Sequence, residues 1–137
     1  MEWELKQPAR GDMVRIAIGS IFHYGIFVSE EEVIQFGYPP VGGILNQPEN
    51  VTVVSSDIHF FCGNAFLEVG VPDKKEKKKV RKADDIVAAA RARMGEGGYS
   101  IIHNNCEHFV YECVFGEKRS SQVDDIRQKV QKMLGKS

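Results

Sequence analysis

The apolar residues of this chain follow a short-period pattern in the first half of the sequence. Residues 11–19 (GDMVRIAIG) alternate apolar with polar or small side chains, and residues 23–29 (HYGIFVS) form a compact β-rich run. Residues 31–38 (EEVIQFGY) follow after only a charged turn, so the two runs predict a β-hairpin. Residues 51–55 (VTVVS) and 58–69 (IHFFCGNAFLEV) predict further strands. The first half is therefore expected to form an antiparallel sheet.

The second half changes to a helical period. Residues 83–94 place their apolar side chains on one helical face and run into glycines. A short strand is expected over 99–102, followed by a helix over 105–115 that ends at Gly116. A last amphipathic helix is expected from Ser121 onwards. These patterns predict an α+β fold, with the antiparallel sheet of the N-terminal half packed against C-terminal helices.

Composition limits the classes of function that need to be considered. With 137 residues, the chain fits one domain over residues 1–137, and a net charge of −1 gives no reason to expect nucleic acid. The lysines gather in residues 73–82, which we interpret as a solvated loop or the start of a helix rather than a contact to an anionic surface. No apolar run approaches the ~20 residues that span a bilayer. The N-terminus is too polar for a signal peptide, and three cysteines argue against a disulfide framework. We therefore expect a soluble cytoplasmic protein.

Cys106 is the first candidate for chemistry. Asn104 or Asn105 is a good N-cap, and Asn105 in that position would put Cys106 in the first turn of a helix. Unpaired backbone N–H groups and the helix dipole there favour a thiolate and lower the thiol pKa. The same N–H groups can receive the oxyanion of an acyl-transfer intermediate. The alternative is a buried structural cysteine, which is a common state of this residue type.

Neither neighbouring histidine is an evident partner for that thiol. His108 lies two residues along the helix and points away from Cys106, so a structural role is expected for it. The reach of His103 depends on the backbone path before the helix. A zinc site built from these residues and Cys113 lacks the usual ligand spacing, so we expect no metal and no other cofactor. Cys113 and Cys62 are interpreted as core residues.

Two segments together resemble the lecithin:retinol acyltransferase-like family, which also includes small phospholipase/acyltransferases. They are HYGIFV (23–28) and NNCEHFVYECVFG (104–116), in this order, within closer matches over residues 11–36 and 99–123. The family is a circularly permuted relative of papain-like (NlpC-type) cysteine hydrolases. The resemblance implies a thiol nucleophile at Cys106 and a general base at His23, which would form an acyl-thioester from a lipid ester.

The chain departs from the family pattern at Gln35. Familiar members carry a second histidine twelve residues after the first, and the same count from His23 arrives at Gln35. The amide oxygen of Gln35 can hold one tautomer of the base, as a neutral amide does in papain-like triads. The expected triad is therefore Cys106, His23 and Gln35. His59 is a weaker alternative for the third position.

These residues lead to an expected enzyme, a thiol-dependent acyltransferase or phospholipase A-type hydrolase. Its expected partner is a phospholipid or another acyl-ester substrate. The alternatives are a papain-like amidase or peptidase, and a catalytically weak binding or regulatory module of the same fold. The C-terminal DDIRQKVQKMLGKS is amphipathic rather than a hydrophobic anchor. The last helix is therefore expected to be a packing element, with transient membrane contact as the lesser alternative.

Overall fold

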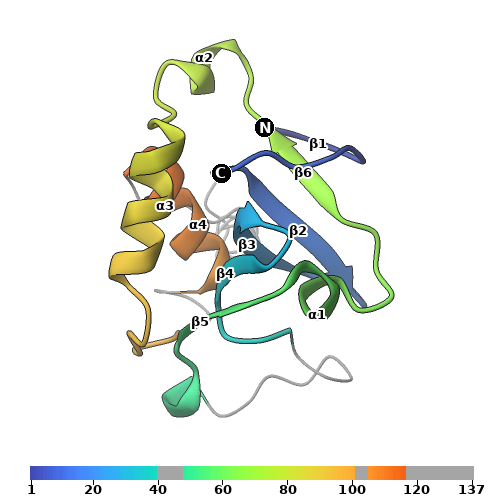
Figure 1. The fold of residues 1–137 in the computed structure, drawn as a ribbon, viewed down its shortest axis with the longest axis vertical. Helices are drawn as coiled ribbons and strands as arrows, with labels where there is room; N and C mark the ends of the chain where they lie inside the picture. The colour runs from blue at the N-terminus through green and yellow to red at the C-terminus, as the bar shows by residue number, and fades with distance from the viewer. Residues whose placement is uncertain (40–47, 101–104, 117–137) are drawn as a thin grey trace, which may run out of the picture.

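The expected hairpin lies near the middle of a six-stranded sheet in the computed structural model, which describes residues 1–39, 48–100 and 105–116 (Figure 1). The strand order is β1-β6-β2-β3-β4-β5, and every neighbouring pair is antiparallel. The strands are β1 (Glu2–Glu4), β2 (Met13–Ile18), β3 (Ile21–Ser29), β4 (Glu32–Phe36), β5 (Val53–Ser56) and β6 (Glu68–Val71). The helices are α1 (Ile58–Cys62), α2 (Lys74–Lys77), α3 (Ala83–Ala92) and α4 (Cys106–Phe115). The α+β prediction, with helices from the C-terminal half against an antiparallel sheet, is confirmed.

The two faces of the sheet are covered by different helices. Side chains alternate along a strand, so neighbouring residues of β3 face opposite ways. Tyr24, Ile26 and Val28 join the larger buried cluster, which includes α3 and α4. Phe27 joins a smaller cluster around Phe61 of α1. In Figure 1, α3 and α4 accordingly lie together beside the sheet, and α1 lies apart from them.

One expected strand is wrong over most of its length. Residues 58–62 form α1, and only the end of the expected run belongs to a strand, β6. The cause is a capping interaction, because the Asp57 side chain accepts a hydrogen bond from the Phe60 N–H at 2.8 Å. The short edge strand β1, which pairs with β6, has too few residues to carry a period and was not expected.

The helices agree more closely with the sequence pattern. Helix α3 ends two residues before the expected end, and Gly95 follows it with a φ of 83°. Helix α4 matches the expected segment, with Asn105 as its N-cap. The lysine-rich segment does begin a helix, α2. Of the expected strand over 99–102, only its first two residues are described, and the last expected helix lies outside the described residues. None of the helices in the described ranges is long and apolar enough to cross a membrane.

Strands β3 and β4 are not paired over the first residues of β3, and this unpaired stretch positions the site. β3 pairs with β2 from Ile21 to Ile26, but its ladder with β4 starts only at Ile26. The Phe27 N–H donates to the Asp12 carbonyl on the β2 side. Since N–H directions alternate along a strand, the Tyr24 N–H points to the β4 side, where the ladder gives it no partner. This gap leaves a backbone donor for another element.

Candidate active site

Cys106 fills the gap between β3 and β4 from the start of α4. The backbone N–H groups of Tyr24, Cys106 and Glu107 lie near its thiol and act to lower the thiol pKa. These donors favour the thiolate, as the helix start predicted. Burial nevertheless has the larger effect, since Cys106 is only 8% exposed, and it raises the thiol pKa to about 11. The expected lowering of the pKa is therefore wrong in the resting protein, because burial outweighs the helix terminus.

Asn105 holds the start of α4 through a reciprocal capping box. Its Oδ1 accepts a hydrogen bond from the His108 N–H at 3.0 Å, and its own N–H donates to His108 Nδ1 at 3.3 Å. The structural role expected for His108 is therefore confirmed. The ring of His108 thus serves the helix terminus on which Cys106 sits.

Tyr99 is a site residue that the sequence did not reveal. Its hydroxyl group hydrogen-bonds with Cys106, and its ring meets Phe36 edge to face with a centroid distance of 5.1 Å. Burial and the nearby thiol raise the pKa of this hydroxyl, so it keeps its proton as a donor. The sequence around Tyr99 indicates only a short strand, and no local spacing connects a tyrosine to a cysteine seven residues later.

Glu107 is a second residue that the sequence did not single out. It is 1% exposed, and its carboxyl group accepts a hydrogen bond from the Tyr24 hydroxyl and raises the pKa of the Cys106 thiol. Arg15 donates to the same tyrosine oxygen and, through Nε, to Glu68 at 3.1 Å. This polar chain ties the start of α4 to β2, β3 and β6. This network holds the Cys106 thiol at one position relative to the sheet.

His23 lies on β3, on the face of the sheet that α1 covers. It is 4% exposed, and its ring centroid lies 5.4 Å from that of Phe61. Burial lowers the imidazole pKa to about 4, although hydrogen bonds to Gln35 and to the Gly37 backbone act in the opposite direction. The imidazole is therefore neutral at pH 7 and free to accept a proton.

Gln35 lies beside His23, as the count of twelve residues requires. His23 Nε2 and Gln35 Oε1 are 3.1 Å apart, and the Gln35 side chain is fully buried. Gln35 Nε2 donates to the Val33 carbonyl at 3.1 Å and to Ser56 Oγ at 2.9 Å. Every polar atom of this amide thus has a partner on the sheet. His59, the alternative third member, lies exposed on α1 instead of on a strand.

The structure brings two of the three expected site residues into direct contact. His23 and Gln35 are hydrogen-bonded, and Cys106 contacts the backbone of Tyr24, the residue that follows His23. The hydrogen bonds of the described residues do not include one between Cys106 and His23. Cys106 belongs to the buried cluster that includes α3 and α4, whereas the His23 ring lies against Phe61 of α1. His103 lies outside the described residues.

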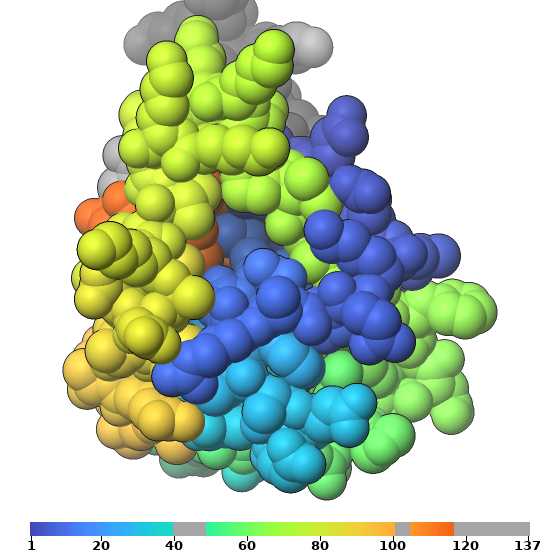
Figure 2. All heavy atoms as spheres, turned by 45° about the horizontal axis from the view of Figure 1, so that its top comes forward, coloured from blue at the N-terminus to red at the C-terminus, as the bar shows by residue number. Residues whose placement is uncertain are grey.

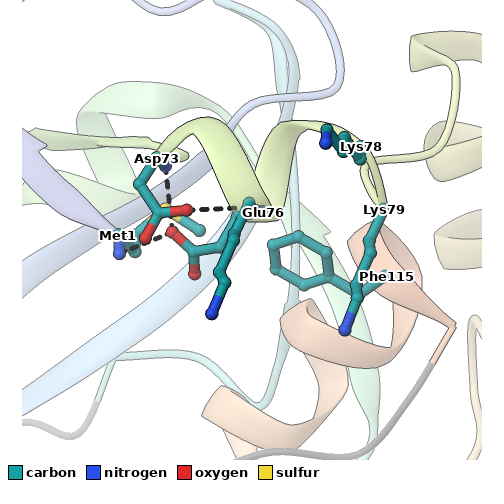
Figure 3. A pocket seen from close by; sticks show the side chains of 7 residues that line it. Met1, Asp73, Glu76, Lys78, Lys79 and Phe115 are labelled. Carbon is teal, nitrogen blue, oxygen red and sulfur yellow. Dashed lines mark hydrogen bonds and ion pairs between the residues drawn. The ribbon is translucent and has the colours of Figure 1, made fainter.

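A separate pocket lies at the far end of α4. Phe115 closes it on one side, and the remaining lining residues come from the N-terminus and from α2 with its flanking lysines (Figure 3). The Met1 amino group forms an ion pair with Glu76 at 2.6 Å within it. Figure 2 turns the molecule so that this end comes forward, with the lysine-rich segment in yellow-green and the N-terminal residues in dark blue. Because Cys106 begins α4 and Phe115 ends it, Phe115 at this pocket is about 14 Å along the helix axis from Cys106.

The comparisons with known proteins agree with one family. A family model described as lecithin retinol acyltransferase matches residues 6–119. Mouse lecithin retinol acyltransferase (Mus musculus) is 26% identical over 140 residues, covering 89% of this chain and 61% of that protein. The bovine protein (Bos taurus) is 26% identical over 147 residues, covering 93% of this chain and 64% of its own length. Human phospholipase A and acyltransferase 4 is 25% identical over 133 residues, covering 91% of this chain and 80% of its own length.

The chain spans less than two thirds of the length of these lecithin retinol acyltransferases. The match of the family model, in contrast, extends from before β2 to beyond the end of α4, and so includes every element that carries a site residue. The chain belongs to the lecithin retinol acyltransferase family.

Proposed function

We propose that this protein is a thiol-dependent acyltransferase or phospholipase A-type hydrolase that forms an acyl-thioester on Cys106 from a lipid ester. The observation that carries the proposal is the hydrogen-bonded His23–Gln35 pair, one residue from the backbone that Cys106 contacts. The names of the relatives, lecithin retinol acyltransferase and phospholipase A and acyltransferase, support a lipid ester as the acyl donor. We also propose that its fold is a circularly permuted form of the papain-like hydrolase fold.

In the proposed reaction both catalytic groups start neutral. The thiol pKa of about 11 and the imidazole pKa of about 4 disfavour a resting thiolate–imidazolium pair. His23 therefore takes the proton from Cys106 as the sulfur attacks the ester carbonyl. The new S–C bond forms while the carbonyl electron pair moves onto oxygen. When the intermediate collapses, the C–O bond breaks and the departing alkoxide takes the proton from the imidazolium, which leaves the acyl-thioester.

The groups around the thiol also suit the oxyanion of this reaction. The N–H groups of Tyr24 and Glu107 and the hydroxyl of Tyr99 all contact Cys106 in the resting protein. When the sulfur is bonded to carbon, these donors no longer serve the thiol and can serve the adjacent oxyanion. We assign Tyr99 the role of a donor to that oxygen. The donors are held by α4, β3 and the Phe36 ring, so little reorganisation is needed.

The second half-reaction delivers the acyl group to water, an alcohol or an amine. His23 removes the proton from the acceptor, whose oxygen or nitrogen attacks the thioester carbonyl, and the sulfur leaves and recovers a proton. Cys106 and His23 are both less than a tenth exposed. A site with so little access to water favours transfer to an organic acceptor over hydrolysis. The acyltransferase branch is therefore the preferred form of the proposal.

Two alternatives differ in what they predict for Cys106. An amidase or peptidase would use the same nucleophile, so it would form its covalent intermediate from an amide and not from a lipid ester. A binding or regulatory module would form no intermediate at all. Gln35 in place of histidine is the feature that favours this module, because an amide carries no charge to stabilise an imidazolium.

Intact-mass spectrometry after incubation with a short-chain phosphatidylcholine tests the proposal. We expect an increase in mass by one acyl group, which disappears in Cys106→Ala and forms more slowly in His23→Ala. Cys62→Ser is the matched control, since it removes a half-buried thiol on α1 and should keep the adduct. An adduct from a peptide or amide substrate alone would support the amidase. The absence of any adduct in a folded wild-type protein would refute the enzyme.

A further inference from the structure

The partners of Gln35 fix the orientation of its amide. The Val33 carbonyl can only accept a hydrogen bond, so it must face the Nε2 group. Ser56 Oγ donates its own proton to the Asp57 carbonyl at 3.0 Å, so toward Gln35 it can only accept. Both neighbours therefore demand a donor. The –NH2 group faces them, and Oε1 faces His23.

The orientation of the amide in turn fixes the tautomer of His23. Because Oε1 accepts only, the neutral imidazole must carry its proton on Nε2 to make the 3.1 Å hydrogen bond. Nδ1 then keeps its lone pair and is the nitrogen able to take a proton; the Gly37 backbone, which also hydrogen-bonds with the ring, favours the protonated imidazole. The reversed amide would place an oxygen against the Val33 carbonyl and an –NH2 group against Nε2. It would select the opposite tautomer, in which Nδ1 is already protonated.

We propose that Ser56 is a positioning residue that, together with the Val33 carbonyl, sets which nitrogen of His23 is the base, acting through Gln35. This inference rests on the proposed function of His23. The placement of Ser56 suits the role, because it ends β5 directly opposite Val33 in the ladder with β4. The next residue, Asp57, caps α1, which carries the Phe61 ring that lies against His23. The adjacent residues Ser56 and Asp57 thus hold, respectively, the Gln35 amide and the helix whose Phe61 ring packs on the imidazole.

Nitrogen NMR of histidine-labelled protein at pH 7 tests the proposal, because it distinguishes the two neutral imidazole tautomers without any substrate. In the wild-type protein we expect His23 to be protonated on Nε2. Ser56→Ala removes one of the two acceptors that face the amide, and only the Val33 carbonyl remains to hold it, so we expect a new population protonated on Nδ1 beside the wild-type tautomer. In the same variant we expect the acylation of Cys106 by short-chain phosphatidylcholine to slow about fivefold, with little change in half-saturating lipid concentration.

Two variants control this experiment. Ser56→Thr keeps the hydroxyl on a side chain that strands accept, so it should restore both the wild-type tautomer and the rate. Ser55→Ala removes the neighbouring half-buried hydroxyl of β5, which faces the other side of the sheet, and should change neither. Wild-type spectra in Ser56→Ala, or an equal change in Ser55→Ala, would overturn the proposal. A wild-type protein that forms no thioester would refute the proposed function, and the spectra would still decide the role of Ser56.

Discussion

At the scale of single residues, burial has a larger effect on the site than local sequence does. A cysteine at a helix start is expected to have a lowered pKa, yet the Cys106 thiol pKa is raised to about 11 because the side chain is buried. The same physical cause lowers the His23 pKa to about 4. Both shifts favour the neutral forms, so in the proposed mechanism the proton moves from Cys106 to His23 only during attack. A preformed thiolate would have been exposed to oxidation and alkylation.

Tyr99→Phe tests the oxyanion donor at this scale. The variant keeps the ring that packs on Phe36 and removes only the hydroxyl that contacts Cys106. We expect the rate of acyl-adduct formation to fall on the order of 100-fold, measured by quenched-flow mass spectrometry under single-turnover conditions. Tyr38→Phe is the control, since its ring is half exposed, and it should keep the wild-type rate. An unchanged rate in Tyr99→Phe would remove the tyrosine from the mechanism.

At the scale of elements, the site depends on how closely α1 and α4 approach opposite faces of the sheet. Gly25 of β3 has no side chain at the point where Phe61 of α1 packs down. A Cβ there would lie 2.9 Å from the Phe61 ring and 2.8 Å from a Val33 methyl group. On the other face, the Asn105 cap and the Glu107–Tyr24 contact hold the first turn of α4 at the gap between β3 and β4.

Gly25→Ala should therefore push α1 away from the sheet. We expect a loss of about 1–3 kcal/mol in the free energy of unfolding, measured by urea denaturation, because the added methyl group overpacks the site. The His23 imidazole would then lose its contact with the Phe61 ring, so its NMR signals should shift as well. Gly97→Ala is the matched control, because its added Cβ would come no closer than 3.9 Å to the nearest atom, the Val51 carbonyl oxygen. Equal losses in both variants would argue against a special role for the close approach at Gly25.

Asn105→Ala tests whether the N-cap of α4 holds Cys106 in position on the other face of the sheet. Loss of the cap leaves the His108 N–H without its Oδ1 acceptor, so we expect the free energy of unfolding to fall by about 1 kcal/mol. The first turn of α4 should loosen, and acyl-adduct formation should slow more than the modest loss of stability would explain. Asn105→Asp keeps an acceptor and should retain most of the stability. Asp73→Ala, at the exposed cap of α2, should leave the acylation rate unchanged.

At the scale of the whole molecule, the sequence predicts what is local and misses what the topology brings together. The β3–β4 hairpin and α4 are predictable because a period, a short turn and an N-cap lie within a few residues of each other. Helix α1 was missed because its apolar run has the composition of a strand and only Asp57 signals a cap. The contacts of Tyr99 with Cys106 and of Ser56 with Gln35 join separate segments, and no spacing encodes them. His23 and Gln35 were found through a family resemblance, since their separation of twelve residues has meaning only once the hairpin is known.

The buried neutral imidazole should make global stability depend on pH. The His23 pKa is about 4 in the folded protein, below its ordinary value of 6.5. As pH falls below about 6.5, the unfolded chain therefore binds a proton that the folded protein does not, and stability decreases. From pH 7 to pH 4 this linkage amounts to about 3 kcal/mol, whereas above pH 7 it contributes only a small further change that fades by about pH 8.

Urea denaturation of wild type and His23→Asn across this range isolates the linkage from that of the carboxylates. We expect the stability difference between the two proteins to shift by about 3 kcal/mol in favour of the variant between pH 7 and pH 4. Phe27→Leu, a core substitution on the same strand that keeps the imidazole, should lower stability by the same amount at every pH. A constant difference between wild type and His23→Asn would mean that the imidazole gains its proton in the folded protein as readily as in the unfolded chain. His23 would then be an imidazolium in weakly acidic solution, and the neutral-pair mechanism would hold only above that range.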